Sequence, residues 1–258
     1  ASLTDADEQP LVRCGSVSLS AEASGSVGNT AGVSQDFLWV SSNPSIATVD
    51  ISGMVTACKK GSVTITAKAN DGSGKSAQYK LAVQQPVAEL TAISKTTTAF
   101  AYGMKPVITA NVLPLTANQR GVVWSVDRTD IASITATGVL SLKADISEPT
   151  LITVTATANG AYEPLTDTVT LTAYPKTQSL TNIDHATITL AVDETIEPQY
   201  TLNPENAMPL VWRSTNGNIV SVDALSGAVC GVKTGSAYVY GETADGTKKK
   251  VSYRVVVQ

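Results

Sequence analysis

Apolar and polar residues alternate with a period of two along most of the chain. Residues 64–68 and 187–190 are examples, with β-branched side chains at many of these positions. Such alternation is typical of a half-buried strand, because successive side chains of a strand point to opposite faces of the sheet. No stretch combines helix caps with an apolar stripe at a spacing of 3.6 residues. The pattern predicts an all-β protein built from short antiparallel strands.

The strand pattern recurs three times, and tryptophan marks each recurrence. The chain holds three tryptophans, Trp39, Trp124 and Trp212, which are separated by 85 and 88 residues. A unit of this length can build its own core, unlike a solenoid repeat of about 20–50 residues. An indole is a natural core anchor because it buries a large apolar area. We therefore expect the three rings to lie in cores, with a ligand platform as the alternative.

About seven short strands in each unit indicate three tandem immunoglobulin-like Greek-key β-sandwiches. Two proline-containing segments, residues 84–86 and 173–176, are the expected linkers, and proline would stiffen these joints into a semi-rigid rod. The polar start, residues 1–10, is predicted to be a tether. The predicted domains are residues 1–85, 86–175 and 176–258.

Glycines recur at matching places in the units. One follows each tryptophan after 14 or 15 residues, where a hairpin needs a residue with positive φ. Another precedes the long alternating strand in units one and three, and a third follows Asp or Asn before the final strand. Unit two has a longer loop, residues 145–149, in place of the second glycine. The predicted turn glycines are Gly53, Gly138, Gly227, Gly61, Gly235, Gly72, Gly160 and Gly246.

The combined motif resembles the bacterial immunoglobulin-like domain, group 2. Residues 39–50 read WVSSNPSIATVD, and a glycine, a short MVTA strand, a second glycine and a TITA strand follow. Residues 195–257 match the same pattern throughout, whereas residues 113–124 keep only LPLTA and the tryptophan. The resemblance implies an Ig-like sandwich on a bacterial or phage surface, as in invasin-type and intimin-type adhesins and in surface lipoproteins. It implies no catalytic residue.

Candidate chemistry is sparse. His185 is the single histidine, and neither a Ser-His-Asp triad nor a zinc site is indicated around it. No phosphate-binding glycine loop occurs. We predict that the chain is not an enzyme, with no catalytic residue, no cofactor and no metal ligand. Three acidic loop clusters, at residues 5–8, 127–130 and 193–197, are expected to be solvated charge, with a weak calcium site as the alternative.

Cysteines and lysines leave two further alternatives open. Cys58 and Cys230 are expected to be small strand residues, and one disulfide between Cys14 and Cys58 is the alternative. Lys248, Lys249 and Lys250 are expected to protect an edge strand from aggregation. Binding of an anionic glycan or envelope polymer is the alternative for this lysine run.

The charge balance limits the partners. The net charge is −4 and charged residues make up 16% of the chain, without a basic segment typical of nucleic-acid binding. No run of 18 apolar residues occurs, so membrane attachment is expected only through a missing N-terminal anchor. The chain is predicted to be a monomer with an unknown surface ligand, either a host or envelope protein or a glycan.

These features predict a non-catalytic structural spacer or adhesion module on the extracellular or periplasmic face of a bacterium. The alternative is a carbohydrate-binding or spacer region of a larger glycan-active surface protein. Tyr102, Tyr162 and Tyr174 are the candidate exposed aromatic residues for that alternative.

Overall fold

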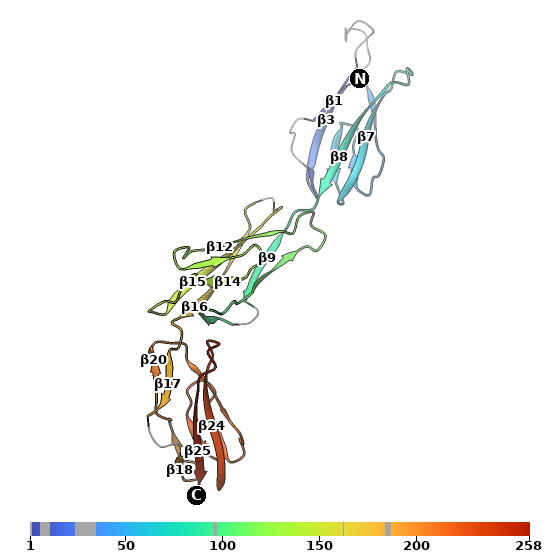
Figure 1. The fold of residues 1–258 in the computed structure, drawn as a ribbon. Helices are drawn as coiled ribbons and strands as arrows, with labels where there is room; N and C mark the ends of the chain where they lie inside the picture. Colours follow the sequence, from blue (N-terminus) through green and yellow to red (C-terminus); the bar gives the residue numbers. More distant parts are fainter. Residues whose placement is uncertain (1, 6–10, 24–34, 95–96, 162, 184–186) are drawn as a thin grey trace. The chain divides into compact units, whose positions relative to one another are not determined.

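A computed structural model describes residues 2–5, 11–23, 35–94, 97–161, 163–183 and 187–258 (Figure 1). In these ranges the regular elements are all β-strands, and no helix is present. The predicted all-β fold class is confirmed. His185, Tyr162, the glycine-containing stretch 25–29 and residues 6–10 of the expected tether lie outside the described residues.

The chain divides into two compact units. Unit 1 comprises Ala1–Leu90, Val112–Gly121 and Ala158–Leu165, and unit 2 comprises Thr91–Asn111, Val122–Thr157 and Thr166–Gln258. The predicted boundaries after residues 85 and 175 stay a prediction.

Residues 2–84 form two four-stranded sheets. The strands are β1 (Ser2–Asp5), β2 (Leu11–Val12), β3 (Ser16–Glu22), β4 (Phe37–Ser41), β5 (Ala47–Val49), β6 (Met54–Ala57), β7 (Gly61–Ala69) and β8 (Ser76–Gln84). Their orders are β1-β3-β6-β5 and β2-β8-β7-β4. One core cluster takes buried side chains from both sheets, among them Leu19 and Val55 from the first and Ile65 and Val83 from the second. This is the two-layer packing of a β-sandwich.

Residues 89–174 form one four-stranded sheet and two short pairs. The strands are β9 (Glu89–Ser94), β10 (Ala99–Ala101), β11 (Ile108–Leu113), β12 (Val122–Val126), β13 (Ala132–Ile134), β14 (Leu140–Leu142), β15 (Thr150–Ala158) and β16 (Thr166–Tyr174). The large sheet has the order β10-β16-β15-β12, and the pairs are β11-β9 and β13-β14. A second core cluster joins Ile152 and Leu171 of the large sheet to Ile108 and Leu140 of the pairs.

Residues 179–257 repeat this plan with three sheets. The strands are β17 (Ser179–Asn182), β18 (Thr187–Leu190), β19 (Thr195–Ile196), β20 (Tyr200–Asn203), β21 (Leu210–Ser214), β22 (Val220–Val222), β23 (Val229–Gly231), β24 (Gly235–Thr243) and β25 (Lys250–Val257). The orders are β18-β25-β24-β21, β19-β23-β22 and β17-β20. The third core cluster includes Trp212, Val229 and Tyr253.

Three strand pairs run parallel, which differs from the antiparallel sheets predicted. The short strands β2, β10 and β18 each lie parallel to the last strand of their stretch, which is β8, β16 and β25. A Greek-key path explains the parallel pairs, because it returns the final strand beside an opening strand that runs in the same direction. Each of the three four-stranded sheets that contain these pairs is therefore mixed at one edge.

Part of the expected N-terminal tether is a strand. Residues 2–5 form β1, which pairs antiparallel with β3 over four residue pairs from Ser2↔Glu22 to Asp5↔Leu19. The backbone explains the difference from the prediction, because the open edge of β3 offers peptide groups to any extended segment, polar or not.

Candidate functional site

The three indoles contact three different core clusters. Trp212 is buried, with 3% of its surface exposed, and its ring lies 5.6 Å from that of Tyr200 and 6.4 Å from that of Tyr253. Trp39 and Trp124 are only half-buried, and each packs against the edge of its cluster. Trp212 therefore lies within its core, whereas Trp39 and Trp124 are only partly covered by theirs.

The glycines that follow Trp39 and Trp212 pack closely against the indoles. A Cβ on Gly227 would lie 2.6 Å from Trp212 Cε2, and a Cβ on Gly53 would lie 2.8 Å from Trp39 Cζ2. Both glycines also adopt positive φ, 80° and 86°. The near-constant spacing from Trp to Gly therefore has two physical causes, a left-handed turn conformation and a lack of room for a side chain. All eight predicted turn glycines have φ between 77° and 154°.

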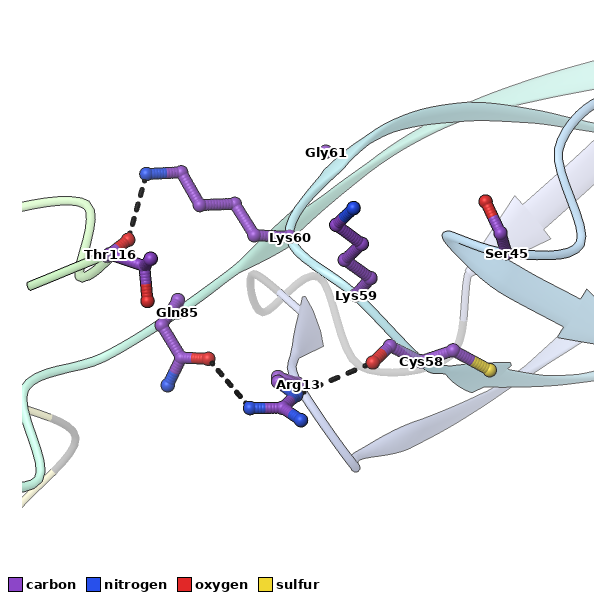
Figure 2. Close-up of a pocket in the computed structure, with 8 residues that line it drawn as sticks. All are labelled: Arg13, Ser45, Cys58, Lys59, Lys60, Gly61, Gln85 and Thr116. Carbon is purple, nitrogen blue, oxygen red and sulfur yellow. Dashed lines mark hydrogen bonds between the residues drawn. The ribbon is translucent and has the colours of Figure 1, made fainter. Parts of the chain in front are cut away.

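A cavity of about 700 Å³ opens on unit 1 (Figure 2). Three of its lining side chains are cationic, and most of the others are small or neutral polar residues. The lining residues are Arg13, Ser45, Cys58, Lys59, Lys60, Gly61, Gln85 and Thr116. They come from the segment after β2, the turn before β5, the turn between β6 and β7 with the first residue of β7, the residue after β8 and the turn after β11.

Backbone hydrogen bonds hold the β6–β7 turn that carries the two lysines. The Cys58 and Lys59 amides both donate to the Ile46 carbonyl, at 2.8 and 3.1 Å. The backbone of Arg13 is held separately, because its amide donates to the Gln84 carbonyl at 2.9 Å. These bonds place the cationic residues on anchored backbone around one opening.

The side chains of the cavity make few bonds among themselves. Arg13 donates from Nε to the Cys58 carbonyl and from Nη1 to Gln85 Oε1, both at 3.4 Å. Lys60 Nζ donates to the Thr116 carbonyl at 2.9 Å. Figure 2 shows the Arg13 side chain extending toward Gln85 and the Lys60 side chain extending toward Thr116.

Among the described residues, no acidic side chain forms an ion pair with this cluster. The ion pairs among the described residues are Arg128–Asp130, Arg213–Glu242 and Lys250–Glu242, and they leave all three cavity cations without a carboxylate partner. In the described chain, the Lys59 ammonium has no hydrogen-bond partner either. The arrangement can accept a negatively charged group.

The cysteines are free thiols. Cys14 and Cys58 are exposed and Cys230 is partly buried, so the alternative of a Cys14–Cys58 disulfide is not formed in this structure. Cys230 lies in β23 as expected, but Cys58 lies one residue beyond β6. Cys14 occupies a turn with a φ of 67°, and its amide donates to the Ala57 carbonyl.

Carboxylates of the acidic clusters at residues 127–130 and 193–197 accept hydrogen bonds from neighbouring protein groups. Arg128 donates from Nε and Nη2 to the two carboxylate oxygens of Asp130, and the Arg128 hydrogen bond, as the largest cause, lowers the pKa of that carboxyl. Asp127 accepts from the Thr153 amide and Glu194 from the Ala191 amide. Over the ranges that the structure describes, no group of three His, Cys, Asp or Glu side chains could hold a metal ion.

The lysine run at residues 248–250 does not protect an edge strand as expected. β25, which begins at Lys250, lies between β18 and β24 inside its sheet. Lys250 Nζ lies 3.4 Å from Glu242 Oε2 on the neighbouring strand. A cross-strand ion pair explains Lys250, while Lys248 occupies the turn with a φ of 57°.

A tyrosine pair outside the predicted candidates lies on the outer face of β24. Tyr238 and Tyr240 stack with ring centroids 6.3 Å apart and an angle of 16° between the ring planes, and Tyr238 is 47% exposed. Across the sheet, Tyr238 is opposite Arg254 and Tyr240 is opposite Arg213. The spacing of two residues in an alternating strand was the signal that could have located this pair.

The two predicted aromatic candidates that the structure describes, Tyr102 and Tyr174, do not form such a pair. Tyr102 is 40% exposed in the turn after β10, and Tyr174 is half-buried at the end of β16.

The described ranges contain no helix that is long and apolar enough to cross a membrane.

Comparison with known families finds a match for the first sandwich. Residues 12–79 match the family model of the bacterial Ig-like domain (group 2). These residues are a group 2 bacterial Ig-like domain. All three cavity cations belong to this bacterial Ig-like domain, whereas Gln85 and Thr116 lie beyond it. The resemblance is confirmed for one copy, and a second and a third copy stay predictions.

Two relatives extend the comparison. An uncharacterized protein of Clostridium acetobutylicum is 32% identical over 96 residues, which cover 37% of this chain and 10% of that protein. The Ig-like virion protein of Serratia phage KSP90 is 29% identical over 168 residues, which cover 64% of each chain. This chain therefore spans less than two thirds of the length of either relative.

Among solved structures, the chain is similar to invasin, a bacterial integrin-binding protein. The likeness has a TM-score of 0.37 and a sequence identity of 14%, and it covers 99% of this chain and 58% of that one.

Proposed function

We propose that the chain is a non-catalytic Ig-like module of a bacterial cell surface and serves as a structural spacer or adhesion module. The observation that carries the proposal is the use made of the repeated residues. The tryptophans pack against cores, and the glycines following Trp39 and Trp212 pack against the indoles. The residues common to the three tryptophan-containing repeats thus maintain a scaffold. Binding is left to surface positions that differ between the repeats.

The family match supports this proposal. Residues 12–79 belong to an Ig-like family, and Ig-like families are typically non-catalytic. A surface role also agrees with the name of the virion protein to which the chain is similar. Of the two possible surfaces, bacterial and viral, we propose the bacterial cell envelope as the location.

Labelling of intact cells tests the proposal. An antibody raised against residues 12–79 should stain intact cells that express the full-length protein as strongly as permeabilised cells. Staining only after permeabilisation of every membrane would contradict a surface location. Staining of purified phage particles but not of cells would contradict the cell-envelope assignment.

The second candidate function is that of a carbohydrate-binding region in a larger surface protein. The stacked Tyr238–Tyr240 pair favours it, because exposed aromatic rings beside arginines are suited to contact with sugars. On a glycan array, replacing both tyrosines by Ala should abolish any binding, while Tyr102→Ala, at an aromatic residue of similar exposure, should leave binding unchanged. Equal loss from both variants, or an array without a bound glycan, would count against this function.

A further inference from the structure

We propose that the cavity formed by Arg13, Lys59 and Lys60 binds an oxyanion, phosphate or carboxylate, carried by an anionic glycan. The choice of a glycan as carrier rests on the proposed surface function. The oxyanion chemistry rests on the cavity alone.

The first argument is the charge of the lining. Among the eight described lining residues three are cations and none is an acid, although the chain as a whole has a net charge of −4. Like charges at one opening repel each other, and that repulsion is relieved when an anion binds between them. A metal cation would be repelled from the same opening.

The second argument is the supply of unused donors. Arg13 uses Nε and Nη1 for bonds within the protein, which leaves its Nη2 amino group for a ligand. Lys60 uses one bond of its ammonium group, and Lys59 has no partner in the described part of the chain. Guanidinium and ammonium donors form charge-assisted hydrogen bonds with phosphate and carboxylate oxygens.

The third argument is the size and lining of the cavity. Its volume of about 700 Å³ lies in the range of sites that hold a small organic ligand, roughly 300–1,000 Å³, and exceeds what one oxyanion would fill. The remaining space is bordered by the neutral polar residues Ser45, Gln85 and Thr116. Amides and hydroxyls of this kind suit sugar hydroxyls, and the described lining residues include no bulky apolar side chain.

The test uses the intact chain and three probes: tetragalacturonate, inorganic phosphate and neutral cellotetraose. Titration calorimetry should show binding of tetragalacturonate that weakens as salt is added, because salt screens the charges. Inorganic phosphate should bind more weakly at the same site, and cellotetraose should not bind detectably. Lack of binding by both anionic probes would overturn the proposal. Phosphate that binds as tightly as tetragalacturonate would overturn the glycan carrier.

The chain offers a charge-matched control. Lys59→Gln with Lys60→Gln should weaken tetragalacturonate binding about tenfold, the factor that corresponds to one lost charge-assisted hydrogen bond. Lys248→Gln with Lys249→Gln removes the same charge at another turn and should change binding less than about twofold. Equal weakening by both double variants would show general charge attraction and overturn the site. Surface labelling is independent of these variants, so failure of the cavity site is distinguishable from failure of the proposed function.

Discussion

The stretches around Trp39 and Trp212 follow the same strand pairing but bury their indoles to different degrees. In both, the tryptophan strand pairs with a nine-residue strand, which pairs in turn with the last strand. Trp39 is half-buried, whereas Trp212 is 3% exposed. The repeated motif therefore determines where the indole is attached, and other residues determine how deeply it lies.

The residue across the sheet accounts for part of this difference. Trp39 is opposite Ala67, and Trp212 is opposite Gly241. A Cβ on Gly241 would lie 2.8 Å from Trp212 Cη2, so the indole occupies space that an alanine would need. Tyr200 and Tyr253 then surround the ring, and Tyr253 is held by a 2.6 Å hydrogen bond from its hydroxyl to the Gln199 carbonyl.

Replacing the two tryptophans should give the largest contrast. Trp212→Ala should lower the free energy of unfolding by about 3–5 kcal/mol, because it empties a fully packed position. Trp39→Ala should cost about half as much, because that side chain is only partly buried. Urea unfolding followed by hydrogen exchange on peptides from each stretch measures both values. Equal losses in the two stretches would contradict the difference in burial.

Exchanging the residues opposite the indoles should have a smaller effect. Gly241→Ala should destabilise the third stretch, residues 179–257, by about 1–3 kcal/mol through overpacking against the ring. Ala67→Gly should cost about 0.5–1 kcal/mol, the usual effect of glycine within a strand. Thermal unfolding of the whole chain, combined with hydrogen exchange on peptides from each stretch, measures both changes in stability. A neutral Gly241→Ala would show that the indole is not confined by its neighbour.

Acid should affect the final hairpin turn of the third stretch more than that of the first. Burial opposes ionisation of Asp245, but hydrogen bonds from Thr247 and Thr177 outweigh it, so its pKa lies below the ordinary 3.8. The Ser73 hydroxyl, as the largest cause, likewise lowers the pKa of the exposed Asp71. Because both folded-state values are depressed, the stabilisation is complete above about pH 4 and is lost as pH falls through the folded pKa.

Variants at these two turns measure the acid effect. Asp245→Asn should lower stability at pH 7 by about 1 kcal/mol and make it less dependent on pH between 5 and 2. Asp71→Asn should do so to a smaller extent, because its carboxylate is open to water. Unfolding free energies at a series of pH values provide the measurement. An unchanged pH profile in Asp245→Asn would show that this carboxylate does not carry the acid sensitivity.

The smallest effect is expected at the outer face of the third stretch. Glu242 Oε2 forms ion pairs with Arg213 Nη2 at 2.7 Å and with Lys250 Nζ at 3.4 Å. Both basic side chains are more than half exposed. Glu242→Gln should cost less than about 1 kcal/mol and less still in high salt. A loss above that value, measured by urea unfolding, would indicate a coupled network instead of exposed pairs.

Much of the fold could be predicted from the sequence, because its signals are local. Alternation marks the strands, and the glycine after each tryptophan marks a turn that needs positive φ. The parallel pairs, such as β10 beside β16, could not be predicted, because they depend on which strands meet at a sheet edge. The same reason explains why β25 was expected to be an edge strand and lies inside its sheet.

The candidate site was less predictable. Arg13 lies far in sequence from Lys59 and Lys60, and only the fold brings them to one cavity. All three tryptophans were expected to lie in cores, but the depth of burial depends on residues from other strands such as Gly241 and Tyr253. The Tyr238–Tyr240 pair was predictable in principle from its spacing, since alternate residues share a face.

The most direct test of a scaffold built from separate cores is hydrogen exchange in Trp124→Ala. Unit 2 contains both the core cluster around Phe100 and Leu171 and the cluster around Trp212. We predict that the substitution increases exchange in β10, β15 and β16 and leaves β21, β24 and β25 as protected as in the unaltered protein. A comparable loss of protection in the last three strands would contradict the account, because it would show one cooperative body in place of independent modules.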